Sequence, residues 1–189
     1  HGALLPEVDL APAAGVTASV LYQPADPQLD VGGDWYDVFA LPDDRVAIAV
    51  GDVVGHDLSA ATTMGKLQPL LRVFAHESHD PAKVLARLDR ASRHVDRAVM
   101  ATVGLAVFDC RSRMLTYSCA GHPPPLLLTD EGAELLGGAR GLPLGVVPDG
   151  AREAAQVHVP DPAQLVWYTD GLVERRRESL ARGLDRLER

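Results

Sequence analysis

The order of elements along this chain favours an α+β fold, with strands first, two helices next and a longer run of strands after them. Residues 45–50 alternate and then become continuously apolar, as a buried strand does, and a turn signal at residues 42–44 precedes them. Apolar residues at helical spacing follow between residues 58 and 95. A parallel βαβ sheet would alternate strands with helices, so we expect α+β layering instead.

The first residues differ in composition from the rest. Residues 1–14 are rich in Ala and Pro and lack periodicity, so we interpret them as a linker from an upstream region. Residues 15–189 are predicted to form one domain, and Val16–Tyr22 has strand character. The chain begins without Met and has no apolar run near the ~20 residues of a membrane span, so we expect a fragment of a cytoplasmic protein that does not enter a membrane.

Two helices are predicted next. The first runs from about Leu58 to Glu77, with Asp57 as a possible N-cap and with Pro69 expected to kink or divide it. The second opens with Asp80 as N-cap and Pro81 at its first position.

Short strands separated by turn signals are expected after the helices, followed by a last helix that begins near Glu178. The predicted strands are Thr102–Phe108, Met114–Ser118, Leu126–Thr129, Gln156–Val159 and Leu165–Tyr168.

Charge and cysteine content exclude some classes of protein. The net charge is −8, which argues against nucleic acid as a partner, because a phosphate backbone requires a basic surface. The two cysteines, Cys110 and Cys119, fall on a predicted strand pair, and we expect reduced thiols in place of a disulfide.

Aspartates stand in glycine-punctuated turns next to apolar strands. Asp34 and Asp37 lie in the segment GGDWYD, Asp52 ends the apolar strand at 45–50, and Asp170 lies in Thr-Asp-Gly. Carboxylates at buried strand ends are costly to desolvate unless a positive charge meets them. Oxygen ligands without paired Cys or His spacing point to hard divalent ions, Mg²⁺ or Mn²⁺.

Five sequence blocks carry a resemblance to a known family, and together they cover roughly residues 15–180. In order and approximate spacing they resemble the SpoIIE/RsbU-type phosphatases, the bacterial branch of the metal-dependent type 2C (PPM) serine/threonine phosphatases. The resemblance implies a four-layer α/β/β/α sandwich of two antiparallel sheets flanked by helices. The blocks are GGDWYDVF at 32–39, GDVVGHDLSAA at 51–61, AGHPPPLLL at 120–128, GLPLGV at 141–146 and YTDGLVERR at 168–176.

The same resemblance implies a metal site and a reaction. Asp52 would bridge two metal ions, the carbonyl of Val53 would also coordinate, Asp34 would hold one ion, and Asp170 would hold the other. Two Mn²⁺ or Mg²⁺ ions would activate water for hydrolysis of phosphoserine or phosphothreonine. The implied substrate is a phosphorylated anti-sigma-factor antagonist of the STAS type in bacterial partner-switching regulation, and an upstream sensor domain is expected in the parent chain.

Histidines and one further aspartate have supporting roles in this hypothesis. Asp37 is expected to be structural or to support the ligands. His56 is the nearest candidate to protonate the leaving group, with ordering of its loop as the alternative. His122 is expected to pin the strand edge near the metals, while His76 and His79 are interpreted as surface residues.

Glycines near the site are expected to be structural. Those of the GGD turn, Gly33 among them, and Gly171 are expected to supply backbone angles that other residues avoid, and Gly51 precedes the bridging aspartate.

One departure from the family keeps other functions open. The family has a further Asp-Asp pair on a last strand, and no matching pair follows Asp170. We therefore expect the last strand and one ligand to be missing, with one ion or none bound by this fragment. A catalytically weak pseudophosphatase that acts as a protein-binding module is the alternative, and a phosphoesterase for small molecules is a third.

Overall fold

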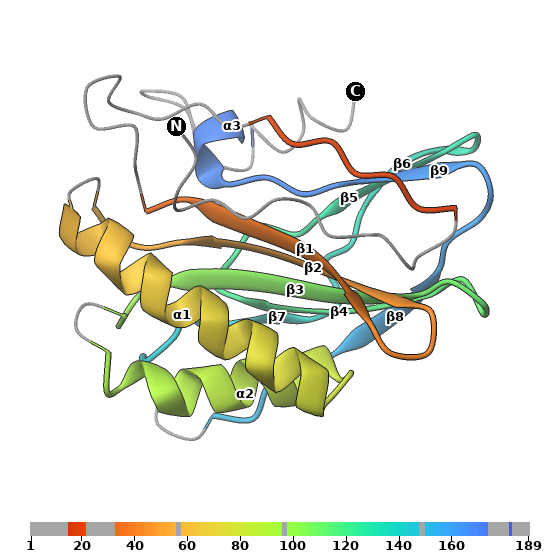
Figure 1. Cartoon of the computed structure of the whole chain (residues 1–189). Coiled ribbons are helices and arrows are strands. Elements are labelled where there is room, and N and C mark those ends of the chain that lie inside the picture. Colours follow the sequence, from red (N-terminus) through yellow and green to blue (C-terminus); the bar gives the residue numbers. More distant parts are fainter. Residues whose placement is uncertain are drawn as a thin grey trace.

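The computed structural model describes residues 15–21, 33–55, 58–95, 98–147, 150–173 and 182 (Figure 1). Two β-sheets are stacked face to face, and two helices cover the outer face of the larger sheet. In Figure 1 the helices lie below the larger sheet and the smaller sheet lies above it. The predicted α+β layering is therefore observed.

The larger sheet has the order β1-β2-β3-β4-β7, and β8 also pairs with β4. Its first four strands are antiparallel neighbours, whereas β7 runs parallel to β4, which corrects the expectation of purely antiparallel sheets. The strands are β1 (Trp35–Leu41), β2 (Arg45–Asp52), β3 (Thr102–Asp109), β4 (Met114–Ala120), β7 (Arg140–Gly141) and β8 (Ala155–His158).

The smaller sheet is antiparallel, with the order β6-β5-β9. It consists of β5 (Leu126–Thr129), β6 (Gly132–Leu135) and β9 (Ala163–Val166). Leu115, Tyr117 and Leu127 are buried between the two sheets, and Trp167 packs against them. A short helix, α3 (Asp170–Val173), follows the last strand.

Helices α1 (Leu58–Glu77) and α2 (Pro81–Ser92) bury their apolar stripes on the larger sheet. Because β2 and β3 have this helix layer on one face and the second sheet on the other, their central residues are apolar on both sides. The carboxylate of Asp80 caps α2 and accepts from the backbone N–H of Ala82 at 3.0 Å, as predicted. None of the described helices is long and apolar enough to cross a membrane.

Several sequence-based boundaries hold and others are wrong. The first helix begins and ends as predicted, but it continues unbroken through Pro69. Residues 16–21 are not in a strand, whereas β1 was not predicted at all. The proposed cap Asp57, the linker at 1–14 and the helix from Glu178 lie outside the described residues.

Both cysteines are free thiols, as expected. Cys119 is buried in β4, whereas Cys110 is only partly buried in the turn after β3. Burial raises the pKa of the Cys119 thiol to about 12, so this thiol stays protonated at neutral pH.

Candidate metal centre

Two of the predicted aspartates face each other across neighbouring strands. Asp52 is the last residue of β2, and Asp34 directly precedes β1. Because Trp35 pairs with Gly51 in the antiparallel register, Asp34 is placed opposite Asp52, and the charge of Asp34 acts on Asp52. This position at one end of the larger sheet follows from the hairpin that joins β1 to β2.

The third aspartate comes from the far end of the chain. Asp170 begins α3, and the hydroxyl of Thr169 next to it donates to Asp34 Oδ2 at 2.9 Å. Asp170 itself is exposed, and its charge acts on both Asp34 and Asp52. Three carboxylates that are far apart in sequence therefore lie at one end of the sandwich.

The electrostatics of the cluster are those of a site that lacks positive charge. Burial, the charges of Asp34 and Asp170 and the hydrogen bond to Asp34 raise the pKa of Asp52 to about 7. Burial also raises the pKa of Asp34. Both shifts show that two negative charges this close together, and partly buried, are unfavourable. A divalent cation would meet the same need for positive charge.

Gly33 brings the backbone of the Val53 segment against the first turn. The N–H of Val53 donates to the carbonyl of Gly33 at 3.1 Å. A Cβ at position 33 would lie 1.9 Å from the carbonyl oxygen of Val53 and 3.0 Å from Asp52 Oδ1. The residue must therefore be glycine for reasons of space. The expected special backbone angle is wrong for both Gly33 and Gly171, because neither has a positive φ.

His122 joins three segments behind the carboxylates. Its Nε2 lies 3.0 Å from the carbonyl oxygen of Tyr168, and its Nδ1 lies 2.9 Å from the hydroxyl of Thr102. A carbonyl can only accept, so Nε2 carries the proton and the hydroxyl of Thr102 donates to Nδ1. Burial lowers the pKa of His122 to about 4, which keeps the ring neutral. This geometry suits a residue that pins the strand before Asp170.

Two tryptophans lie against glycines close to the cluster. A Cβ at Gly51 would lie 2.4 Å from the Trp35 ring, and a Cβ at Gly104 would lie 2.3 Å from the Trp167 ring. Trp35 belongs to the core under the helices, whereas Trp167 packs in the core between the sheets. Each glycine thus makes room for an indole on a different face of the larger sheet.

Asp37 lies away from the cluster and is paired. Its carboxylate is 1% exposed and accepts from the Arg72 guanidinium at 2.6 and 3.0 Å. The guanidinium also lies 4.5 Å from the centre of the Phe39 ring. This two-pronged ion pair ties α1 to β1 and does not face the other carboxylates.

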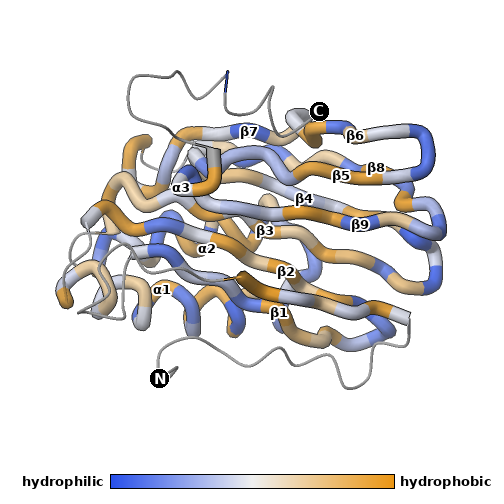
Figure 2. Tube along the Cα trace, turned by 90° about the horizontal axis from the view of Figure 1, so that it is seen from above, coloured by the Kyte–Doolittle hydropathy of each residue, from blue (hydrophilic) through white to orange (hydrophobic). Residues whose placement is uncertain are grey.

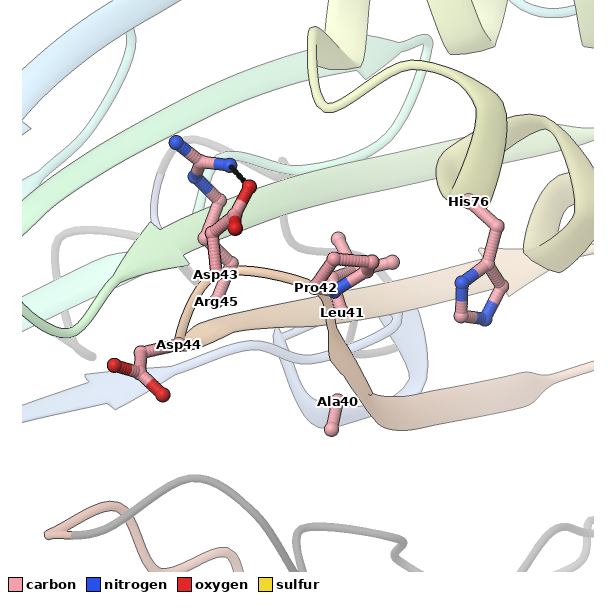
Figure 3. Close-up of a pocket in the computed structure, with 7 residues that line it drawn as sticks. All are labelled: Ala40, Leu41, Pro42, Asp43, Asp44, Arg45 and His76. Atoms are coloured by element: carbon pink, nitrogen blue, oxygen red, sulfur yellow. Dashed lines mark hydrogen bonds and ion pairs between the residues drawn. The ribbon is translucent and has the colours of Figure 1, made fainter.

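Of the other predicted residues, Val53 lies at the carboxylates and His76 and His79 lie far from them. Val53 is buried beside Asp52, whereas His56 lies outside the described residues. His76 lines a pocket of about 360 Å³ beside the β1–β2 turn (Figure 3), and His79 Nδ1 lies 2.8 Å from Arg45 Nη1 there. This turn is at the opposite end of β2 from Asp52, so the pocket is remote from the carboxylates.

Sequence reasoning missed three residues that shape the centre, namely Thr169, Thr102 and Gly104. An isolated glycine inside a strand pattern signals a close approach, so Gly104 could have been found. The two threonines had no such signal, because their partners come from distant segments.

The donors fit a hard divalent ion. Within the described ranges, no three His, Cys, Asp or Glu side chains converge closely enough to hold an ion by themselves. Mg²⁺ commonly binds through one or two carboxylates and keeps several waters, so Asp34 and Asp52 with a nearby backbone carbonyl meet its needs. Asp170 adds negative charge at the edge of this pair.

Comparison with known proteins adds a family match and relatives. Residues 42–189 match the family described as Stage II sporulation protein E (SpoIIE). The chain is 30% identical over 179 residues to Protein IcfG of Synechocystis, covering 80% of this chain and 28% of that protein. It is 29% identical over 155 residues to Phosphoserine phosphatase RsbP of Bacillus subtilis, covering 77% of this chain and 37% of that protein. The chain thus spans well under half the length of these two curated relatives.

A solved structure extends the similarity to three dimensions. The crystal structure of the RsbU and RsbW domains of Rv1364c from Mycobacterium tuberculosis is similar with a TM-score of 0.76 at 33% identity. The match covers 93% of this chain and 46% of that one. The predicted fold class is thereby confirmed.

Proposed function

The chain belongs to the SpoIIE family, and from that premise we propose that it is a metal-dependent phosphatase domain that hydrolyses phosphoserine or phosphothreonine on another protein. A relative of similar sequence, RsbP, is named a phosphoserine phosphatase. The single observation that carries the proposal is the placement of the Asp34 and Asp52 carboxylates opposite each other at one end of the larger sheet, with the charge of Asp170 acting on both.

This arrangement is unfavourable in the absence of a cation. Partly buried carboxylates repel one another and lose solvation, which is why the pKa of Asp52 is raised to about 7. A protein that keeps two such groups together at one sheet end, with the charge of Asp170 beside them, has a use for positive charge there. We therefore assign Asp34, Asp52 and Asp170, with the carbonyl of Val53, to the binding of Mg²⁺ or Mn²⁺.

Divalent ions, when bound, would activate water and offset the negative charge of a phosphoryl group. The residues of this chain hold and orient the oxygen ligands. Gly33 lets the Val53 carbonyl approach the first turn, Thr169 positions the carboxylate of Asp34, and neutral His122 fixes the backbone that carries Thr169 and Asp170.

We further propose a phosphorylated anti-sigma-factor antagonist of the STAS type as the substrate, with an upstream sensor domain in the parent chain. The support is the similarity to RsbP and to the RsbU domain of Rv1364c, whose crystal structure also contains an RsbW domain. A protein substrate also agrees with the acidic net charge of −8, which argues against nucleic acid as the substrate.

The test is release of phosphate from p-nitrophenyl phosphate and from a phosphoserine protein, with and without Mn²⁺. We expect activity to depend on the metal and to fall at least about a thousandfold in Asp52→Asn, because uncatalysed hydrolysis of phosphate monoesters is extremely slow. Asp43→Asn is the matched control, since Asp43 is an exposed aspartate in the turn at the other end of β2. Equal activity of Asp52→Asn and the wild type would refute the assignment.

A non-catalytic binding module is the second candidate. It is favoured by the observation that, in the described part of the chain, no three metal-binding side chains converge on a single point. Calorimetric titration of the intact parent chain with Mn²⁺ separates the two functions. Binding with a Kd in the micromolar range or below, lost in Asp52→Asn, supports the phosphatase, whereas absence of binding supports the module.

A further inference from the structure

Exposed apolar side chains are concentrated at the end of the sandwich that carries the carboxylates. Among the described residues, eight of the eleven large apolar side chains that are exposed follow or precede the strand ends at this side. In Figure 2, several connections at the end where α3 lies are coloured as apolar. Monomeric proteins seldom gather exposed apolar residues in this way without a binding role. The eight are Val54, Leu58, Val99, Met100, Leu142, Val146, Val147 and Leu172.

Five of these residues belong to two segments that lie side by side, and we call them the apolar rim: Val99, Met100, Leu142, Val146 and Val147. Their exposed fractions range from 39% to 56%. The two segments are joined by reciprocal backbone hydrogen bonds, in which Met100 N–H donates to Leu144 O at 2.8 Å and Leu144 N–H donates to Ala101 O at 2.9 Å. The two segments that carry the rim are therefore held side by side.

The strand register places the rim beside the metal centre. Asp52 is the direct partner of Thr102 in the antiparallel pair of β2 and β3, and Met100 precedes Thr102 by two residues. Antiparallel partners lie about 5 Å apart and each extended residue adds about 3.3 Å, so the Cα of Met100 is within roughly 12 Å of the Cα of Asp52. A ligand that spans this distance is larger than a simple phosphate monoester.

A buried ion pair between Asp89 and Arg152 links the apolar rim to α2. Asp89 of α2 accepts from the backbone N–H of Gly145 at 2.7 Å and from Arg152 Nη2 at 2.8 Å. Arg152 Nη1 donates in turn to the carbonyl of Leu142 at 3.0 Å. The side chains of Asp89 and Arg152 are 6% and 7% exposed, so this buried ion pair anchors Leu142 and Gly145 to α2. A surface that is fixed before binding loses less entropy when a partner docks.

Resting on the proposed function, we propose that the apolar rim is a docking surface for the folded phosphoprotein substrate, next to the phosphoserine that enters the metal centre. The partner is a globular protein with an apolar patch within about 12 Å of its phosphorylated residue, because Met100 of the rim lies within that distance of Asp52. Cations held by the acidic centre would recognise the phosphate, and the rim recognises the protein that carries it.

The test compares a protein substrate with a small one. Val99→Gln and Val147→Gln remove apolar surface without adding charge near the carboxylates. Val73→Gln is the matched control, because Val73 lies on α1 and is 52% exposed, as is Val99. The substrates are p-nitrophenyl phosphate and a purified STAS-domain protein that carries one phosphoserine, both with Mn²⁺.

We expect the double variant Val99→Gln/Val147→Gln to raise KM for the phosphoprotein about tenfold, with kcat and the constants for p-nitrophenyl phosphate within about twofold of the wild type. Val73→Gln should change neither substrate. Equal KM values for the phosphoprotein in all three proteins would overturn the docking role. A double variant that becomes monomeric from a dimer in sedimentation, with unchanged KM, would also overturn it and assign the rim to a second copy of this chain.

The docking role and the proposed function fail in distinguishable ways. If the wild type does not hydrolyse p-nitrophenyl phosphate with Mn²⁺, the phosphatase assignment fails. Calorimetric binding of the phosphoprotein to the wild type and the double variant then still measures the rim. At least tenfold weaker binding of the double variant would support the docking surface, and equal binding would refute it.

Discussion

Replacing Gly33 by alanine tests whether close backbone packing builds the metal centre. The added Cβ would lie 1.9 Å from the carbonyl oxygen of Val53 and 2.9 Å from its carbonyl carbon. Ordinary contact needs about 3.4 Å, so the Val53 segment and the first turn must separate by roughly 1.5 Å. A displacement of about 1 Å at a reacting centre can cost a hundredfold in rate. We therefore expect Gly33→Ala to lower kcat/KM for p-nitrophenyl phosphate at least about a hundredfold.

The same clash should affect stability to a smaller degree. Forced overpacking of a buried segment costs about 1–3 kcal/mol, which urea unfolding measures directly. Gly65→Ala is the matched control, since Gly65 lies in α1 and an added Cβ would meet nothing within 4 Å. We expect this control to keep full activity and to gain about 0.5–1 kcal/mol from the better helix propensity of alanine.

Wild-type activity and stability in Gly33→Ala would show that the Val53 segment can move away without effect. The contact with Gly33 would then not be what positions the Val53 carbonyl. Loss of activity in both glycine variants would be equally damaging, because it would point to a general effect of the substitution and not to the clash.

Three further predictions concern buried charge. Because the pKa of Asp52 is raised to about 7, the destabilisation caused by its negative charge in the metal-free fold is absent below about pH 4 and complete above pH 7. Asp52→Asn should therefore raise the free energy of unfolding at pH 8 by about 1–2 kcal/mol, after allowance for the partial exposure of the carboxylate. This gain should vanish in thermal melts at pH 4. Since the pKa of His122 is lowered to about 4, its neutral ring stabilises the fold fully above pH 6.5, and about 3 kcal/mol of the free energy of unfolding should be lost as the pH falls through 4. Urea titrations at a series of pH values should show this loss in the wild type and not in His122→Gln. Arg72→Met leaves the carboxylate of Asp37 buried without its guanidinium partner and should lower the free energy of unfolding by about 3–5 kcal/mol. Adding Asp37→Asn should recover much of this loss. A double variant no more stable than Arg72→Met would show that the unpaired carboxylate is not the cause.

Long, strongly patterned elements were predictable from the sequence. The helical stripe of α1 and the Asp-Pro start of α2 fixed both helices, because local capping and periodicity determine them. Strand β1 was missed because its residues WYDVFAL include a buried aspartate, whose ion pair with Arg72 depends on a helix 35 residues away. The short strand β7 depends wholly on its pairing with β4 and has no local signal.

In the candidate site, too, some residues were predictable from the sequence and others were not. Asp34, Asp52 and Asp170 stand out because each carboxylate adjoins an apolar strand and a glycine. The partners that hold them do not stand out. Thr169 and Thr102 act through hydrogen bonds that exist only once distant segments are packed together.

The placement of the two indoles has a practical consequence. Trp35 and Trp167 are the only tryptophans of the chain, and each lies within three residues of a carboxylate of the cluster, Asp34 and Asp170 respectively. Trp35 is 1% exposed and packs on the helix side of the sheet, whereas Trp167 packs on the other side. Tryptophan fluorescence, excited where tyrosine does not absorb, therefore reports on this end of the molecule. Titration with a paramagnetic ion such as Mn²⁺ should quench emission in step with occupancy, which makes the unlabelled protein its own optical sensor.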